Sequence, residues 1–471
     1  MSVVSDILRH LTNKSAITRM QTIILVVIVV IVTAGAAASY FVVGPPTTTV
    51  TTILSTTETV LVPTTQTLLV SSTGVVPLST FAGKKIAVVS DVGGRGDLSF
   101  NDMSFKGGAE AEKAFGVKMV ELISKSEADY VPNLETAAKD PDVILVVGIG
   151  FLLTDAMKHA ATAYPDKNFA IIDGSVPDMP NVMSILYEEH KGSAIVGAIA
   201  ALTAAHYRYS HVGVVLGIEI PTLWKFEIGY KWGVDWALKW YETRFGKPAP
   251  VISGTPVKNR VLWTYTGTFS DITKGYEAAK AMYAQDAVAV YNVAGPLGLG
   301  LNQAVQETAT QSGLTMGPPF WIGVDADQDW INPGFVLASM MKRVDRGVYF
   351  ATELVVQGKF RQVVADNKGI VTLGIGTKVS GIDITGISVS TLADLDEFIA
   401  MGTNAENLTG KTVLPMSPDE IKSKVSAMRN SIPSWVWDAA TELENAIRAD
   451  PTLVPLAMSQ AEVDHWRAIL G

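Results

Sequence analysis

The amino-acid sequence predicts an α/β protein in which two parallel sheets, each covered by helices, form two lobes with a cleft between them. From residue 84 onward, short apolar runs typical of buried strands alternate with segments of helical periodicity. This alternation favours parallel sheets that lie between layers of helices. It continues for about 300 residues, which would make a single sheet very wide, so two sheets are the simpler arrangement.

The expected strands are runs of apolar residues in which β-branched side chains are common. They are Lys85–Ser90, Val143–Val147, Phe169–Asp173, Val182–Leu186, Val212–Leu216, Ala287–Asn292, Phe320–Val324 and Val336–Met341. The expected helices between them are Phe105–Ala114, Leu152–Ala163, Gly192–Ala205, Lys225–Thr243, Ile272–Gln285, Leu299–Ser312 and Val344–Gln357. We expect residues 84–188 and 334–358 to form lobe 1, and residues 189–333 and 359–385 to form lobe 2.

The N-terminal part of the chain predicts a transmembrane helix. Residues 21–43 carry no charge and are numerous enough to cross a bilayer. The preceding residues 1–20 contain three basic side chains and one acidic side chain, Asp6. The positive-inside rule therefore places the N-terminus in the cytoplasm and the predicted lobes outside the cell, on a single-pass anchor in the cell membrane. A buried helix of a soluble domain is the less favoured alternative.

Processing of this N-terminal segment has three possible outcomes, of which the first is retention as an anchor. A removed secretory signal is the second, and Ala36–Ser39 offers a weak cleavage site for it. The third follows from Asn13–Gln21, which resembles the prepilin-type signal of archaeal sugar-binding proteins. The resemblance implies cleavage near Ala16 of this chain, which would leave the apolar helix attached. The chain has no cysteine, which excludes a lipobox, disulfides and thiol catalysis.

Two further segments differ in composition from the predicted lobes. Residues 44–83 are rich in Thr, Ser and Val and nearly uncharged, which predicts an extended extracellular linker, with a short edge strand as the alternative. Residues 386–471 predict a mostly helical C-terminal extension. Its helix-start signals, Ser417–Glu420 and Ser459–Glu462, each place a serine three residues before a glutamate. We expect three tryptophans to pack this extension against the lobes: Trp435, Trp437 and Trp466.

Composition excludes several classes of function. The net charge is −9 and no basic stretch with interleaved aromatic residues occurs, so nucleic acid is not an expected partner. The six histidines are scattered and show no metal-ligand spacing, so neither a metal nor a cofactor is expected. No Gly-x-Gly-x-x-Gly follows the first strand, and Ser99 has no evident base, which disfavours an enzyme.

Candidate ligand-binding residues follow the strands, where the carboxyl ends of a parallel sheet form one edge. The glycine-rich loop 91–101 combines carboxylates, an amide and an aromatic ring directly after the first strand. Similar polar or aromatic residues lie after later strands or in the helices that follow them. The full set of candidates is Asp91, Phe100, Asn101, Phe151, Asp173, Phe226, Phe269, Gly295, Asp325 and Lys342.

Eight sequence blocks connect these strand ends to a known family. They are DVGGRGDLSFN, VGIGFLLTDA, AIIDG, EIPTLWKFEIGY, GTFSDITKGYEAA, YNVAGPLGLG, IGVDADQDWINPG and SMMKRVDRGVY. Their order over about residues 84–380 resembles the basic membrane protein family, which comprises nucleoside-binding components of ABC importers. The resemblance implies a type I periplasmic-binding-protein fold, a purine nucleoside-like ligand between the lobes, and ABC permease and ATPase subunits as partners.

The resemblance also implies roles for individual residues around the base. Phe100 would stack on one face of the base, and Phe226 and Phe269 would cover the other face. Asp91 would accept a hydrogen bond from the base edge, with Asn101 beside it. Stacking surfaces of this kind suit a flat, neutral ring.

Further roles concern the ribose and the hinge. Asp325 and Lys342 would hold the ribose hydroxyls, with the lysine balancing the carboxylate charge. Asp173 corresponds to a polar position near the hinge, whereas Asp97 is expected to be structural. Arg343 and Asp345 are expected to form a surface or hinge pair.

Departures from the family pattern leave the ligand open. Gly295-Pro296 replaces the double glycine that is usual in that loop, and the extension after residue 386 is longer than the family usually carries. A different base, a free sugar or another small polar metabolite is an alternative ligand. A surface filament subunit or a sensory ectodomain that uses the same fold is the alternative function.

Overall fold

The computed structural model describes residues 68–71, 74–77 and 81–471. The predicted transmembrane helix at residues 21–43, its processing signals and most of the linker lie outside these residues. In the part of the chain that is described, no helix is both long and apolar enough to cross a membrane. Within the expected linker, two short strands occur, β1 (Leu68–Ser71) and β2 (Gly74–Pro77).

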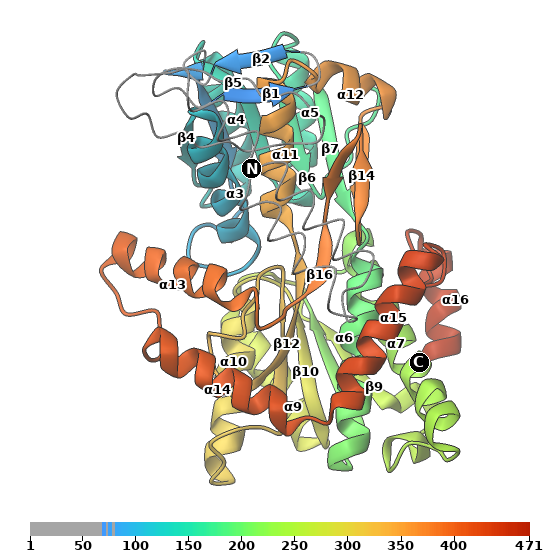
Figure 1. The fold of residues 1–471 in the computed structure, drawn as a ribbon. Helices are drawn as coiled ribbons and strands as arrows, with labels where there is room; N and C mark the ends of the chain where they lie inside the picture. The colour runs from blue at the N-terminus through green and yellow to red at the C-terminus, as the bar shows by residue number, and fades with distance from the viewer. Residues whose placement is uncertain (1–67, 72–73, 78–80) are drawn as a thin grey trace, which may run out of the picture. The chain divides into compact units, whose positions relative to one another are not determined.

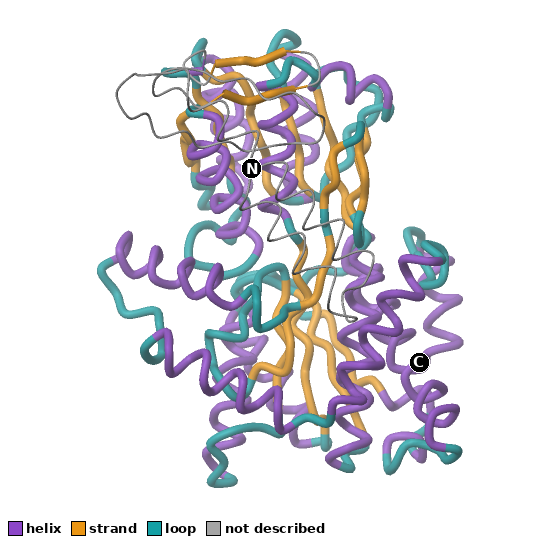
Figure 2. Tube along the Cα trace, in the orientation of Figure 1, coloured by secondary structure: helices purple, strands orange, loops and turns teal. Residues whose placement is uncertain are grey.

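The first lobe contains a six-stranded sheet in the order β13-β7-β6-β5-β3-β4, and all of its pairs are parallel. Its strands are β3 (Lys85–Val89), β4 (Lys118–Leu122), β5 (Val143–Ile149), β6 (Phe169–Ile172), β7 (Val182–Tyr187) and β13 (Ile370–Leu373). Its helices are α3 (Phe100–Phe115), α4 (Tyr130–Lys139), α5 (Thr154–Ala163), α11 (Val344–Val356) and α12 (Phe360–Asp366), with 3₁₀ turns η2 (Glu127–Asp129) and η3 (Phe151–Leu153). Figure 2 shows the strands enclosed by helices.

The second lobe contains a six-stranded sheet in the order β16-β12-β11-β10-β8-β9. Its strands are β8 (His211–Leu216), β9 (Val261–Tyr265), β10 (Ala287–Val293), β11 (Phe320–Val324), β12 (Val336–Lys342) and β16 (Ile387–Val389), of which only β16 is antiparallel to its neighbour. Its helices are α6 (Glu189–Tyr207), α7 (Pro221–Phe245), α8 (Val257–Arg260), α9 (Ile272–Ala284) and α10 (Leu297–Gln311), with the 3₁₀ turn η4 (Ile252–Gly254).

The central strands are mostly apolar because helices cover both faces of each sheet. Every residue of β6 and of β10 is buried. Helices α6 and α7 pack unusually closely, since a Cβ on Gly229 or Gly233 of α7 would overlap the backbone of α6. This close packing fixes the two helices whose N-terminal ends reach the cleft.

The chain crosses between the lobes three times, after β7, after β12 and after β13. The expected lobe boundaries are wrong at two of these crossings. Strand β12, expected in lobe 1, pairs with β11 in the second sheet, whereas β13, expected in lobe 2, pairs with β7 in the first sheet. An apolar run shows that a strand is buried but does not show which sheet it joins.

The third crossing contains the hairpin strands β14 (Thr377–Val379) and β15 (Ile382–Ile384), and it ends at β16. Strand β16 was expected in the extension but forms the edge of the second sheet. The rest of the extension is helical, with α13 (Leu395–Thr409), α14 (Pro418–Ser431), α15 (Ser434–Ala449) and α16 (Gln460–Leu470). Both predicted capping boxes are present, at Ser417 and at Ser459.

The extension packs mainly on the second lobe. Helix α15 contacts α6 and helix α16 contacts α7, on the right of Figure 1, while α13 and α14 lie on the left. Trp435 stacks on Trp240 of α7 with 6.5 Å between the ring centroids. Trp466 packs against the cluster that joins Ile228 of α7 to residues of the extension, and the indole nitrogen of Trp437 donates to the carbonyl of a residue in α14. Trp435 and Trp466 therefore pack the extension against the second lobe, as predicted, whereas Trp437 joins two helices within the extension.

Candidate ligand-binding site

All ten candidate residues line one cavity between the two lobes. The cavity encloses about 650 Å³, including space that is open to solvent, which is within the usual range for small-molecule sites. The residues come from the carboxyl ends of both sheets and from the helices that follow, the position at which parallel α/β sheets generally bind ligands. Their meeting at one cavity was a prediction from the sequence, and the geometry agrees with it.

The wall from the first lobe begins at Asp91, directly after β3. Its Oδ1 accepts hydrogen bonds of 2.8 Å from the backbone N–H of Gly93 and from Nδ2 of Asn101. Phe100 and Asn101 form the first turn of α3, so this amide and ring are fixed by the helix. Gly150 has φ of 105°, and a Cβ there would lie 3.1 Å from Oδ2 of Asp91. This glycine leaves room for the second carboxylate oxygen.

Asp97 lines the cavity, but its carboxylate bonds to backbone N–H groups of the same segment. Its carboxylate accepts hydrogen bonds from the backbone N–H groups of Ser99, Asn101 and Asp102, at 2.8–3.1 Å. These bonds satisfy the free N–H groups at the start of α3. Burial, together with the neighbouring Asp102, raises the pKa of Asp97 to about 8. The geometry agrees with the structural role expected for this residue.

The wall from the second lobe supplies two further aromatic rings. Phe226 lies in the second turn of α7 and is buried, with its ring centroid 6.5 Å from that of Tyr291. Phe269 follows β9 and lies so close to Gly217 that a Cβ there would overlap its ring. Phe151, from the first lobe, is 39% exposed. Aromatic rings therefore reach the cavity from both lobes.

A buried lysine forms the charged centre of the site. Lys342 ends β12 and is 2% exposed, and its Nζ pairs with Asp173 of the first lobe and, at 2.9 Å, with Glu189 of the second. The ammonium also lies 5.3 Å from the ring centroid of Phe100 and 5.5 Å from that of Phe226. Although burial opposes it, the surrounding carboxylates raise the pKa of Lys342. The lysine therefore stays charged and links the two lobes.

Two residues of this charged centre, Glu189 and Lys225, were not predicted from the sequence. Glu189 begins α6 and also pairs with Lys225 of α7, whose Nζ donates to the carbonyl of Tyr187 at 2.8 Å. Both residues lie in helices rather than at strand ends, where the candidates were sought. The one available signal was the charged sequence Glu189-His190-Lys191 directly before a long apolar helical run.

Asp325 makes a second polar contact between the lobes. It adopts a positive φ of 65° after β11, and its Oδ2 accepts a 2.8 Å hydrogen bond from Oγ of Ser99 in the first lobe. The expectation that Ser99 has no basic partner is therefore wrong. However, Ser99 is fully buried and does not line the cavity, which makes it a structural donor rather than a nucleophile. Burial raises the pKa of Asp325 to about 6, opposed by Lys342 and Ser99.

The cavity is rich in hydrogen-bond acceptors. Four carboxylates and one ammonium group line it, and the ammonium is already paired. Within the described part of the chain, Oδ1 of Asn101 and Oδ1 of Asp173 are buried and accept no hydrogen bond. Buried polar atoms normally find a partner. The arrangement suits an uncharged ligand with a flat ring and several N–H or O–H donors, and it disfavours a phosphate.

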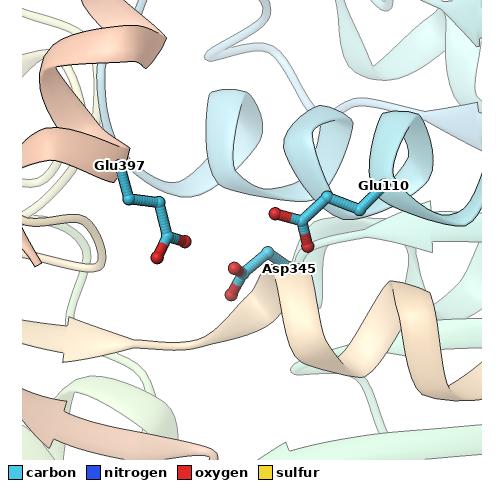
Figure 3. A group of neighbouring side chains, drawn as sticks. All are labelled: Glu110, Asp345 and Glu397. Carbon is cyan, nitrogen blue, oxygen red and sulfur yellow. The ribbon is translucent and has the colours of Figure 1, made fainter. Parts of the chain in front are cut away.

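A separate group of carboxylates, which Figure 3 shows pointing toward one another, lies beside the second crossing. Oxygens of Glu110, Asp345 and Glu397 all lie within 4.8 Å of one another. Nζ of Lys106 lies between them, at 2.6, 2.9 and 2.6 Å respectively. Arg343 adds bonds to Asp345 and Glu397. Because protein cations already neutralise the group, we interpret it as an ion-pair network and not as a metal site.

Comparison with known proteins identifies the family. The family of PnrA-like ABC transporter substrate-binding proteins, Bmp, matches residues 84–242 and 256–397. The chain belongs to this family. An uncharacterized lipoprotein of Pyrococcus abyssi is 36% identical over 370 residues, covering 78% of this chain and 82% of the relative. The ABC transporter nucleoside-binding protein BmpA of Lactococcus lactis is 30% identical, covering 63% and 83% respectively.

A solved structure supports the fold of this PnrA-like protein. An ABC transporter solute-binding protein from Aeropyrum pernix is 31% identical, with a TM-score of 0.68, and the match covers 81% of this chain and 96% of that one. The two-lobed α/β architecture and the family resemblance predicted from the sequence are thus confirmed. Residues 398–471 lie beyond the region that the family matches.

The raised pKa of Asp325 makes a prediction for the ligand-free protein. Below pH 6 the folded protein retains a proton on this carboxyl that the unfolded chain loses near pH 4. Ionisation of Asp325 therefore lowers the free energy of unfolding as the pH rises from about 4 to about 7. Asp325→Asn removes this effect. The free energy of unfolding of the variant, relative to that of the wild type, should therefore rise between about pH 4 and about pH 7, by at most about 3 kcal/mol.

Urea unfolding of both proteins at several pH values measures this difference. Asp142→Asn is the matched control, because Asp142 is half exposed and pairs with a surface lysine away from the cleft. A difference between Asp325→Asn and wild type that is constant from pH 4 to pH 7 would show that Asp325 titrates normally.

Proposed function

We propose that this PnrA-like protein binds a nucleoside in the cavity between its lobes and delivers it to an ABC permease. The observation that carries the proposal is the meeting, in one cavity, of aromatic rings from both lobes with an excess of carboxylates. Rings can sandwich a flat base, and carboxylates accept hydrogen bonds from the hydroxyls of a sugar. The relative in Lactococcus lactis is named a nucleoside-binding protein, which supports the same ligand class.

The geometry supports a division of roles around the base. Phe100 from the first lobe would stack on one face, and Phe226 and Phe269 from the second lobe would cover the other. Asp91 offers its Oδ2 and Asn101 its Oδ1 to donors on the base edge, since their remaining polar atoms already bond within the protein. This pair therefore accepts hydrogen bonds from the ligand without further rearrangement.

The ribose would lie beside the charged centre. Asp325 and Asp173 provide acceptors for its hydroxyls, and the charge of Lys342 opposes the rise in the pKa of each carboxyl that burial causes. Because Lys342 already pairs with Asp173 and Glu189, we assign it mainly to charge balance. Rotation of the lobes about the three crossings would open and close the cavity, and the closed form would dock on the permease and its ATPase subunits.

We further propose that residues 21–43 hold the protein at the outer face of the cell membrane. The Pyrococcus abyssi relative is named a lipoprotein. The 471 residues of this chain contain no cysteine, so a lipid cannot be attached through a thioether. An apolar helix of this length can serve as the anchor instead.

A nucleoside panel tests the ligand class by thermal unfolding. A ligand at 100 times its dissociation constant should stabilise the protein by about 2.7 kcal/mol. Phe100→Ala should weaken binding about tenfold or more, because loss of base stacking costs on the order of 1–3 kcal/mol. The exposed Asp142→Asn should bind as the wild type does. If no purine or pyrimidine nucleoside shifts the unfolding temperature, the assignment of the ligand is wrong.

Charge gives a second test of the ligand. The 5′-monophosphate of the best nucleoside should bind at least about 100-fold more weakly, because the phosphate would enter a cavity rich in carboxylates, and like charges cost several kcal/mol. The 5′-O-methyl nucleoside is the matched control, since it adds bulk at the same atom without charge. Calorimetric titration measures all three affinities. Equal affinity for nucleoside and monophosphate would contradict this account of the site.

A further inference from the structure

The acidic loop of residues 325–332, which follows β11, carries more buried charge than the ligand site requires. Asp325, Asp327 and Asp329 are 6%, 0% and 1% exposed. Of these, Asp325 alone lines the cavity. Burial of a carboxylate is unfavourable unless a cation or several hydrogen bonds compensate for it. Asp327 accepts a hydrogen bond from the backbone N–H of Asp329, within the loop itself, so the partners of Asp329 decide how this loop is held.

The C-terminal extension supplies the cation. The guanidinium of Arg429, in the last turn of α14, donates to Oδ2 of Asp329 at 2.6 Å. Oδ1 of the same carboxylate accepts a 2.8 Å hydrogen bond from Oγ of Ser339 in β12. Arg429 also donates to the backbone carbonyl of Ser390, at 3.0 Å, just after β16. Asp329 is thus fixed between the second sheet and the extension.

A second contact joins the extension to the same loop. Trp330 is completely buried, and a Cβ placed on Gly402 of α13 would lie 2.8 Å from its indole ring. The helix can approach the indole only because residue 402 has no side chain. Arg429 and Gly402 belong to different helices, so the loop is held from two independent positions.

The opposite side of the loop faces the cleft. Asp325 accepts the hydrogen bond from Ser99, and Nε2 of Gln328 donates to the carbonyl of Leu98 in the first lobe at 3.0 Å. Oε1 of Gln328 accepts from the backbone N–H of Val324 at 2.9 Å. A displacement of the loop would therefore move the carboxylate of Asp325, which lines the cavity, together with a contact between the lobes.

We propose that Arg429 is a positioning residue for the binding site, which acts through Asp329 to hold Asp325 in place. The inference rests on the proposed function of the cavity and goes beyond it, because it assigns a role to residues after 397, where the family match ends. The extension is then part of the binding apparatus. A carboxylate that accepts a hydrogen bond from a ligand hydroxyl must be held in position, and the residues that contact its loop on the side away from the ligand do this.

The first test needs no ligand. Hydrogen exchange is measured over residues 324–332 in the full chain, for the wild type, Arg429→Met and the control Lys422→Met. Lys422 lies on the same helix but pairs with the exposed Asp396. Arg429→Met should speed exchange in the loop about tenfold or more, because local opening becomes easier, whereas Lys422→Met should not. Unchanged exchange in Arg429→Met would overturn the inference.

The second test uses ligand discrimination, which a general loss of stability would not change. The wild type should prefer a nucleoside to its 2′,3′-dideoxy analogue, and Arg429→Met should reduce that preference about tenfold, with Arg429→Lys intermediate. In an Asp325→Asn background, Arg429→Met should change the preference less than about twofold, because Arg429 affects ligand binding through the carboxylate of Asp325. Equal weakening of both ligands would mean that Arg429 is merely structural.

The two tests separate failure of this inference from failure of the proposed function. If the wild type binds no nucleoside, the proposed function fails, and the exchange measurement still decides whether Arg429 holds the loop. If Arg429→Met does not fold, Gly402→Ala replaces it, since a methyl group there presses on Trp330 without removing a charge. It should speed exchange in the same loop, and unchanged exchange would again overturn the inference.

Discussion

The ion pairs of Lys342 are the interaction on which the rest of this structure depends. The ammonium lies at the end of β12, where the chain passes from the second lobe to the first, and it pairs with Asp173 of one lobe and Glu189 of the other. Without it, several carboxylates would be buried together with little compensation. A charged lysine at this point allows a cavity that is acidic and shared between two lobes.

The position of the cavity follows from the sheet topology. Both sheets are parallel apart from one edge strand, so the carboxyl ends of their strands form two edges that face the cleft. Several strand ends contribute a short segment, and the helices that follow fix rings such as Phe100 and Phe226 near their N-terminal ends. The acceptors and rings therefore need no long loops to meet, and the extension adds support to the loop after β11.

The sequence predicted the buried centre of the fold well, because a strand covered on both faces is an uninterrupted apolar run. It missed β4, β9, β13 and β16, which are the edge strands of the two sheets, and it placed β12 and the residues of β13 in the wrong lobes. Candidate residues at strand ends meet in one cavity. Glu189 and Arg429 were not found, since each lies in a helix and pairs with a residue far away in the sequence.

The central claim is that the charge of Lys342 stabilises the junction of the lobes. The most direct test is the free energy of unfolding of Lys342→Met, measured with denaturant at neutral pH. Removal of one partner from a buried ion pair costs about 3–5 kcal/mol, and the account predicts a loss of this size that Asp173→Asn in the same chain partly restores. Stability within about 0.5 kcal/mol of the wild type would contradict it.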